Sequence, residues 1–411
     1  MITVGLDFGT HQTKVCIEDK EGAETHYKFQ RFRNLSGQLM YTLPSVIYID
    51  EDRMLHYGYA PQNKKCTVIR YFKQAVFRNY DSQNMKLWEA AFYTIWYLAY
   101  ILFELEREYG QSFSIQMGAP TDSARLNDAK AIAVSLVVSA FRLVEEVFKN
   151  DKERFLSCDF DTLVELTEVV RYTDQLKKDY ALLVFPEAYA CLKPMIGRGK
   201  VSTGMSLIID IGGGTTDISF FTIENGQPQV YDFFSVDKGL NFLTGIDAKS
   251  PSTPPSSLII QQRAKVLHAE ILRLCINLEE RLKVEFKCQT GLEIRRLRDA
   301  LRNRPLIYTG GGSTFKELLY PYIEFKELHT ISYNNWKSKL FDDDELFKNS
   351  SLCPVLSTAY GLAISVATDE ISMKPFRDVF ELSRGAQEES KKIFGEALGG
   401  FDYGTDWDAW K

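Results

Sequence analysis

Apolar and polar residues alternate at the start of the chain, in ITVGLDFGTHQTKVCIED, residues 2–19. A period of two predicts β-strands, and the glycine-containing interruption GTHQ predicts a turn between them. Apolar runs at residues 44–50 and 113–120 predict two further strands. The amino-terminal part of the chain is therefore expected to form a sheet that begins with a hairpin.

Apolar residues recur every three or four positions in several longer segments, which predicts helices. One spans residues 84–109, and another runs to residue 148 with Asp122 as a candidate N-cap. Residues 90–103, AAFYTIWYLAYILF, are uncharged but fall short of the roughly 20 residues that cross a bilayer, so we expect a buried helix there. The charged residues 150–178 also follow a helical pattern.

The second half of the chain also mixes strand and helix patterns. A loop rich in Pro and Ser at residues 250–257 precedes a helix. One face of that helix is predicted to hold Leu267, Ile271, Leu274, Leu278 and Leu282. LIYTGGGSTFKELL, residues 306–319, predicts a strand, a glycine turn and a helix. LSTAYGLAISVA, residues 356–367, is the last regular element expected.

One pattern occurs twice, about half the chain apart. VGLDFGTHQTKVCI, residues 4–17, and IIDIGGGTTDISFF, residues 208–221, share the same plan. Each consists of an apolar strand, an aspartate, a glycine turn with threonine, and a second strand. We infer two related halves that face one another.

Glycine turns of this kind suit anions. Glycine permits positive φ and lets backbone come close to a ligand, and successive free N–H groups form an anion-binding concavity. The residues predicted to contact phosphate are Gly9, Thr10, His11, Gln12, Gly212, Gly213, Gly214 and Thr215. Neither turn has the GxxxxGK[ST] spacing of a P-loop, so we expect phosphates to be held between two hairpins.

Three carboxylates flank these turns. Asp7 and Asp210 end the strands that lead into them, where a carboxylate repels phosphate unless a cation lies between. Mg²⁺ prefers hard oxygen ligands and retains water, so the two aspartates are predicted to hold hydrated Mg²⁺. Asp217, beyond the second turn, is a candidate for orienting an attacking water.

Composition narrows the class of protein. The 411 residues are 45% hydrophobic and carry a net charge of -6, which is ordinary for a globular protein and does not favour a nucleic-acid partner. Seven scattered cysteines without a CxxC pair indicate reduced thiols. No leader pattern is evident, so a cytoplasmic location without membrane contact is expected.

The three glycine motifs resemble those of the actin and heat-shock-chaperone ATPase superfamily. Residues 4–17 and 208–221 resemble its two phosphate motifs, and residues 306–319 resemble its adenosine motif. IQMGAPTDSARLNDAKAIAVSLV and LSTAYGLAISV resemble segments of the nucleotide-binding domain of DnaK-type heat-shock chaperones. The resemblance implies a two-lobed α/β actin-like ATPase fold. Each lobe would be a ribonuclease-H-like mixed sheet flanked by helices, with ATP or ADP and Mg²⁺ in the central cleft.

The resemblance also implies a domain organisation. Lobe I would span residues 1–183, with a helical insertion at 150–178. Lobe II would span residues 184–372, with a trimmed small subdomain at 240–288 and the adenosine motif at 306–316. Residues 373–411 would form a helix and a disordered tail, too short for the substrate-binding domain of the chaperones.

The resemblance further implies residue roles. Asp7 and Asp210 would hold the metal through water, Asp217 would position or deprotonate the attacking water, and Lys73 lies where the catalytic lysine is expected. The expected adenosine contacts are Glu280, Lys283, Gly311, Gly312, Ser313 and Phe315.

The catalytic carboxylate departs from the family pattern. Phe185 stands at the expected glutamate position, and Glu187 lies two residues later. General-base help is worth roughly 10²–10⁴-fold, so slow hydrolysis is one expectation, and Glu187 is the candidate replacement.

Three functions follow from these patterns. The main prediction is a Mg-ATP-binding and hydrolysing switch of chaperone type that acts through a partner or client adaptor protein, docked by residues 394–411 or 150–178. One alternative is an actin-like filament-forming ATPase of the plasmid-segregation type, favoured by the trimmed small subdomain and opposed by the helical insertion. Another is a nucleotide-binding scaffold with weak hydrolysis, motivated by Phe185.

Overall fold

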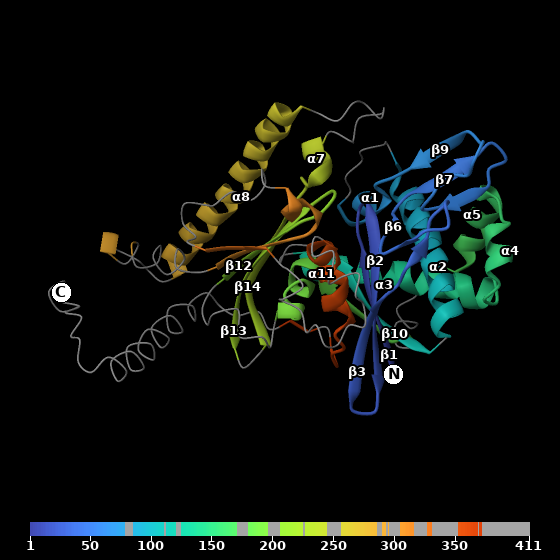
Figure 1. The fold of residues 1–411 in the computed structure, drawn as a ribbon, viewed down its shortest axis with the longest axis horizontal. Helices are drawn as coiled ribbons and strands as arrows, with labels where there is room; N and C mark the ends of the chain where they lie inside the picture. The colour runs from blue at the N-terminus through green and yellow to red at the C-terminus, as the bar shows by residue number, and fades with distance from the viewer. Residues whose placement is uncertain are drawn as a thin grey trace.

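The computed structural model describes residues 1–78, 85–110, 112–120, 125–170, 180–195, 206–224, 227–244, 256–285, 290–292, 295, 305–315, 327–330, 352–368 and 370–371. The described residues form two lobes, each built on its own β-sheet, with a cleft between them (Figure 1).

The sheet of lobe I grows from the predicted amino-terminal hairpin. Its strands are β1 (Ile2–Phe8), β2 (Gln12–Glu21), β3 (Glu24–Phe29), β6 (Leu43–Pro44), β10 (Phe113–Ala119) and β11 (Leu182–Pro186). The first three strands pair antiparallel in chain order, and β10 and β11 continue the sheet parallel to β1. The resulting order is β11-β10-β1-β2-β3, with β6 paired to β2. β1 is central and almost wholly buried, because helices cover both of its faces.

Lobe II repeats this plan. Its strands are β12 (Ser206–Ile211), β13 (Thr216–Glu224), β14 (Gln227–Val236), β15 (Pro305–Thr309) and β16 (Glu327–Thr330). The first three again pair antiparallel in chain order, and β15 and β16 continue parallel to β12. The order β14-β13-β12-β15-β16 is therefore that of lobe I, strand for strand. The predicted pair of related halves, each with a ribonuclease-H-like mixed sheet, is confirmed.

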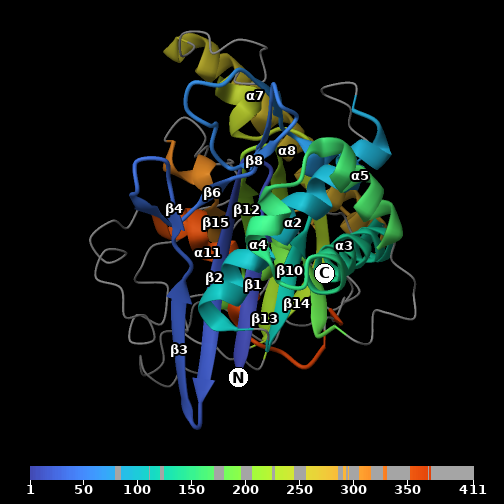
Figure 2. The same cartoon turned by 90° about the vertical axis from the view of Figure 1, so that its right-hand side faces the viewer.

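Helices cover the outer face of the lobe I sheet, in front of β1, β2 and β10 in Figure 2. They are α1 (Phe72–Arg78), α2 (Leu87–Tyr109), α3 (Leu126–Arg142) and the π-helical turn that ends it, η2 (Leu143–Val147). α2 contains the apolar run 90–103, and nearly all of that run is buried against the lobe I core, as predicted. Among the described residues, no helix combines the length and apolarity needed to cross a bilayer.

The predicted insertion belongs to this outer layer. It contains α4 (Lys152–Leu156) and α5 (Phe160–Val169). Phe155 and Leu163 are buried in the lobe I core, and the Trp96 indole of α2 donates a 2.6 Å hydrogen bond to Thr167 of α5. The described part of the insertion is therefore packed onto lobe I.

Short strands extend lobe I above the cleft. They are β4 (Phe32–Arg33), β5 (Leu39–Met40), β7 (Ile47–Asp50), β8 (Leu55–Tyr57) and β9 (Cys66–Ile69). β7 lies between β8 and β9 in a three-stranded antiparallel sheet, and β4 pairs with β5.

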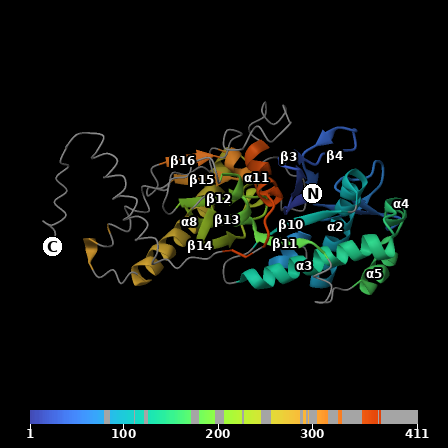
Figure 3. The same cartoon turned by 90° about the horizontal axis from the view of Figure 1, so that it is seen from below.

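A layer between the two sheets joins the lobes. It consists of α6 (Glu187–Ala190), η4 (Lys193–Met195) and α11 (Leu352–Ala363), and Figure 3 shows α11 between the strands of the two lobes. α11 follows lobe II in the chain but packs on β1, β2 and β10. The predicted lobe boundary after residue 183 falls inside β11, which pairs with β10 through Pro186. The lobe I sheet therefore extends past that boundary.

Two helices of lobe II complete the described fold. α7 (Leu240–Thr244) contacts α8 (Ser257–Glu285), which carries Leu267 and Ile271 on its buried face as predicted. The side chains of Leu274, Leu278 and Leu282 lie outside the described set, as do Asp122 and the whole of residues 372–411.

Candidate functional site

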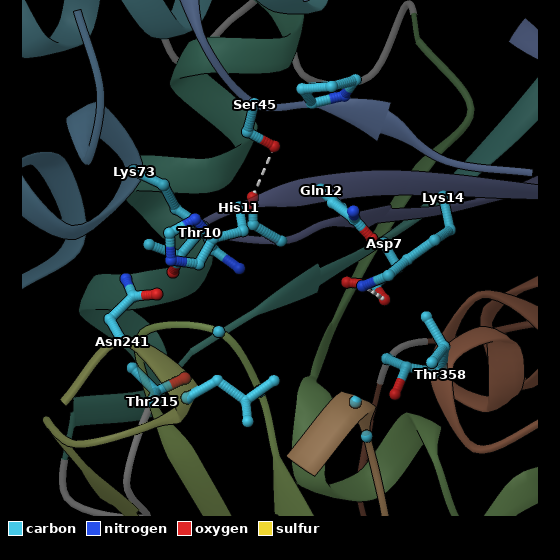
Figure 4. Close-up of a pocket in the computed structure, with 18 of the residues that line it drawn as sticks. Asp7, Thr10, His11, Gln12, Lys14, Ser45, Lys73, Thr215, Asn241 and Thr358 are labelled. Atoms are coloured by element: carbon cyan, nitrogen blue, oxygen red, sulfur yellow. Dashed lines mark hydrogen bonds and ion pairs between the residues drawn. The ribbon is translucent and has the colours of Figure 1, made fainter. Parts of the chain in front are cut away.

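The two glycine hairpins face each other across the cleft. Asp7 is paired with Lys14 in the β1–β2 hairpin, and Asp210 is paired with Asp217 in the β12–β13 hairpin. These four residues line one cavity of about 590 Å³, with the predicted phosphate contacts Gly9, Thr10, His11, Gln12, Gly212, Gly213 and Thr215 (Figure 4). A cavity of this size lies within the range that encloses small ligands.

The glycines of the second hairpin are required for space. Residues 212–214 do not adopt positive φ. A Cβ on Gly213 would lie 2.2 Å from His11 Cδ2, and one on Gly214 would lie 2.5 Å from Gln74 Nε2 and 2.8 Å from Thr10 Cγ2. Glycine is needed at these positions because side chains of lobe I lie close to the backbone of the turn.

Hydrogen bonds from Ser45 fix the shape of the first hairpin. Ser45 Oγ donates a 2.7 Å hydrogen bond to the carbonyl oxygen of Gly9, and the Ser45 N–H donates to the carbonyl oxygen of His11 at 2.8 Å. Thr13 Oγ1 lies 3.0 Å from Ser45 Oγ. These contacts satisfy the carbonyl groups of the turn, which fixes its backbone before any ligand binds.

Glu187 stands at the end of β11, inside the cleft. Its carboxylate lies 2.5 Å from Lys73 Nζ of α1, and both side chains are buried. Burial raises the pKa of Glu187 to about 7, with Lys73 opposing the shift and Asp217 and Asp7 adding to it. The structure thus brings together Lys73 and Glu187, two of the candidate catalytic residues.

Phe185 faces away from this cavity. It packs with Ala190 and Leu362, stacks on Tyr189, and lies under the ammonium group of Lys193. Two residues separate Phe185 from Glu187, and the chain changes from strand to helix between them, so the second residue enters the cleft. Glu187, and not residue 185, therefore supplies a carboxylate to the cavity from this part of the chain.

Asp217 is held by two hydroxyl groups. Thr215 Oγ1 donates to its Oδ2 at 2.9 Å, and Ser235 Oγ of β14 donates to its Oδ1. The carboxylate is buried, and this pair of donors stabilises its ionised form and fixes its plane.

Asp210 lies at the end of β12, where its Oδ2 accepts a 3.0 Å hydrogen bond from Thr358 of α11. Burial, together with the nearby charges of Asp217 and Asp7, raises the pKa of Asp210 to about 8 against the opposing charge of Lys14. Carboxylates this crowded are stabilised by a divalent cation, so the donor set fits Mg²⁺. No three His, Cys, Asp or Glu side chains within the described ranges could hold a metal. Coordination through water, as predicted for Asp7 and Asp210, remains a prediction.

Lys14 is a site residue that the sequence reasoning missed. Its Nζ lies 2.7 Å from Asp7 Oδ2. Burial lowers the pKa of Lys14, but the charge and hydrogen bond of Asp7 outweigh that effect and raise it overall. The available signal was spacing, because Asp7 and Lys14 are seven residues apart, like Asp210 and Asp217.

Other lining residues were also missed, among them Arg70, Asn241 and Thr244. Gln74 reaches the second hairpin from lobe I, where its amide donates a 3.2 Å hydrogen bond to the carbonyl oxygen of Gly214. No motif marks these positions, since they come from helix ends and loops that the fold alone brings to the cleft.

The predicted adenosine contacts are only partly assembled. Gly310, Gly311 and Phe315 line the cleft. Gly312 is buried against Ile211, and the Ser313 hydroxyl donates to the carbonyl oxygen of Gly310, so both lie behind the lining.

The placement of Glu280 differs from the prediction. Glu280 is exposed on α8 and does not line the cavity. It lies thirteen residues beyond Leu267, which is about 20 Å along a straight helix, so α8 carries it away from the cleft. The side chain of Lys283 lies outside the described set.

Solved structures of actin homologues match most of this chain. Two crystal structures of Ta0583, an archaeal actin homolog, cover 88% of this chain and 98% of their own, at 15% and 16% identity with TM-scores of 0.37 and 0.39. The crystal structure of MreB5 of Spiroplasma citri bound to ADP covers 87% and 95%, at 14% identity with a TM-score of 0.44. No family model and no curated protein matches.

These identities and TM-scores are too low to assign a function to this chain. The fold assignment rests on the sheets themselves, because the same five-strand topology occurs twice around one cleft. The expected closeness to heat-shock chaperones remains a prediction. The chain has a two-lobed mixed α/β architecture in which each lobe carries a sheet of the same topology.

Proposed function

We propose that this protein binds ATP with Mg²⁺ in the cleft and hydrolyses it. One observation carries the proposal: two hairpins of the same design close on one cavity, and each has an aspartate near the end of its first strand, Asp7 buried and Asp210 half-buried. Cationic side chains of Lys14 and Lys73 supply attraction for a polyphosphate at the same place.

Each residue has a distinct part in the proposal. The backbone N–H groups of the two turns bind phosphate oxygens, and Phe315 with Gly311 receives the base and ribose. Asp7 and Asp210 hold hydrated Mg²⁺, which would neutralise phosphate charge. Glu187 accepts the proton of the attacking water, and Asp217 orients that water. Lys73 stabilises the charge on the transferred phosphoryl group.

The test combines binding and turnover. Titration calorimetry with Mg-ATP and Mg-ADP is expected to show saturable binding, and the melting temperature is expected to rise with either nucleotide. Phosphate release is expected from the wild type and to fall by about 10²-fold or more in Asp217→Asn. Absence of both heat and melting shift would refute nucleotide binding, and equal release rates would refute the role of Asp217.

A filament-forming actin-like ATPase is the second candidate. The feature that opposed it was the insertion at 150–178, and α4 and α5 of that insertion are packed onto lobe I through Phe155 and Leu163. Sedimentation of the purified protein with Mg-ATP separates the candidates: polymer in the pellet supports the filament, and a soluble protein supports a switch read by a partner. The third candidate, a scaffold with weak hydrolysis, was favoured by Phe185 at the expected glutamate position. It is less favoured now because Glu187 lines the cleft.

A further inference from the structure

Asn241 is a buried polar residue in the cleft for which the proposed function gives no role. It is the second residue of α7, its exposed fraction is 5%, and it lines the same cavity as Lys73, Glu187 and Asp217. Figure 4 shows its amide on the lobe II side, turned toward Thr10 and Lys73. Within the described ranges, the structure offers no hydrogen-bond partner for this side chain.

The amide atoms of Asn241 are open to the cavity rather than sealed in the core, so they are available to hydrogen-bond a group that enters the cleft. The side chain can do this only toward the cavity, because its backbone is fixed from the other side. The N–H groups of Leu240 and Asn241 donate to the carbonyl oxygens of Gly212 and Gly213, at 3.0 and 2.9 Å.

The position within the cleft defines the ligand group. Asn241 sits beside Gly213, whose backbone is in contact with His11 of the opposite hairpin. Lys73, proposed to act on the transferred phosphoryl group, lies at this end of the cavity with it, and Glu187 is paired with Lys73. An adenosine and its nearest phosphates instead lie toward Gly311 and Phe315 in the proposed function.

We propose that Asn241 is a specificity-determining residue that donates a hydrogen bond to the terminal phosphate of a bound triphosphate, and so distinguishes ATP from ADP. The inference rests on the proposed function. An amide suits this role because it donates without carrying charge, and the surrounding site already holds four carboxylates. A carboxylate here would repel a terminal phosphate, and an alanine would leave it without this donor.

The same contact would also connect the terminal phosphate to the helices of lobe II. α7 packs on α8, where Arg263 donates to the carbonyl oxygen of Leu243 at 3.2 Å, and Lys238 pairs with Glu270 at 2.6 Å. A shift of Asn241 on loss of the terminal phosphate therefore bears directly on a helix of 29 residues.

The test compares dissociation constants for Mg-ATP and Mg-ADP by titration calorimetry. In Asn241→Ala, ATP affinity is expected to fall by about tenfold, as for a lost hydrogen bond to a charged group, while ADP affinity stays within about twofold. Asn241→Asp is expected to increase the difference further. The Asn63→Asp variant makes the same chemical change at an exposed residue away from the cleft, and its ratio is expected to equal that of the wild type.

A ratio that stays constant in both Asn241 variants would overturn the inference, and so would an equal loss for the two nucleotides. Alanine is compatible with a helix at this position, so Asn241→Ala alone decides the matter if Asn241→Asp does not fold. Failure of the wild type to bind either nucleotide would instead refute the proposed function itself, which keeps the two outcomes distinct.

Discussion

Glu187 and Lys73 form a buried ion pair that lines the cleft. A carboxylate whose pKa is raised to about 7 can both accept and release a proton near neutral pH. Such a group is poised as a general base, whereas an ordinary exposed glutamate is too weak a base for the task.

The Glu187→Gln variant is expected to keep nucleotide binding and to hydrolyse about 10²–10⁴-fold more slowly, because the amide cannot accept the proton. Single-turnover phosphate release measures this. The matched control is Phe185→Leu, which changes a residue two positions away that faces the core, and its turnover is expected to stay near that of the wild type. A larger loss in the control would reassign the catalytic position to 185.

Lys193 is a cation buried among aromatic rings. It donates to Gln116 Oε1 at 3.3 Å and to the carbonyl oxygen of Ile364 at 3.4 Å, and burial lowers its pKa to about 7 against the opposing charge of Glu18. Between that value and its ordinary value, the unfolded chain binds more protons than the folded one. The free energy of unfolding therefore rises with pH in this window and is insensitive to Lys193 below it.

Chemical denaturation between pH 7 and 9 tests this point. The wild type is expected to gain stability with rising pH, by up to about 1.4 kcal/mol per unit from this residue. Lys193→Met keeps the volume, is expected to be about 2 kcal/mol more stable at pH 7, and should show a flatter pH profile. An unchanged slope would contradict the assignment.

At the scale of elements, α11 is joined to the lobe I sheet through glycines. A Cβ on Gly5 of β1 would lie 2.2 Å from the backbone nitrogen of Ala363, and a Cβ on Gly361 would lie 1.8 Å from the carbonyl oxygen of Ala190. Backbone thus packs on backbone between β1, α11 and α6. This contact sets the distance between the layer that carries Thr358 and the strand that carries Asp7.

Gly361→Ala is expected to destabilise the protein by about 3 kcal/mol, since the obstructing atom is backbone and cannot rotate away. Thermal unfolding followed by circular dichroism gives the value. Gly291→Ala is the control, because Gly291 has open space around its α-carbon, and its melting temperature is expected to stay the same or rise slightly. Equal effects of the two changes would exclude the steric argument.

The elements differed in how far the sequence could predict them. Both hairpins and the buried helix α2 follow from local periodicity, which is why they were anticipated. The side of β11 that Glu187 faces depends on where that strand gives way to α6, and periodicity does not define such an end. Lys14 could have been found from its seven-residue spacing to Asp7, whereas Asn241 needed the tertiary fold, because only the folded chain brings α7 to the cleft.

At the scale of the whole molecule, the lobes are connected across the cleft by a direct contact. Gln74 of α1 donates to the carbonyl oxygen of Gly214, and both groups are buried. Since this hydrogen bond joins the two halves next to the proposed phosphate site, it favours the closed arrangement that encloses a ligand.

Gln74→Ala is expected to release bound nucleotide about fivefold faster, which corresponds to the net value of one hydrogen bond. Stopped-flow displacement of a fluorescent ATP analogue measures the rate. Gln38→Ala, at an exposed residue outside the cavity, is expected to leave the rate unchanged. Identical release from wild type and Gln74→Ala would show that the contact does not hold the lobes together.

Because the sheet topology is repeated in the two lobes, the fold alone does not define which way round a ligand binds. If the two lobes, which share one sheet topology, were also alike in charge, an elongated ligand would bind between them equally well in either of two opposite orientations. Here the equivalent positions in the two hairpins carry opposite charges, a cation at Lys14 and an anion at Asp217. Exchanging those two charges, as in the double variant Lys14→Asp with Asp217→Lys, should therefore reverse the preferred orientation of a bound ligand.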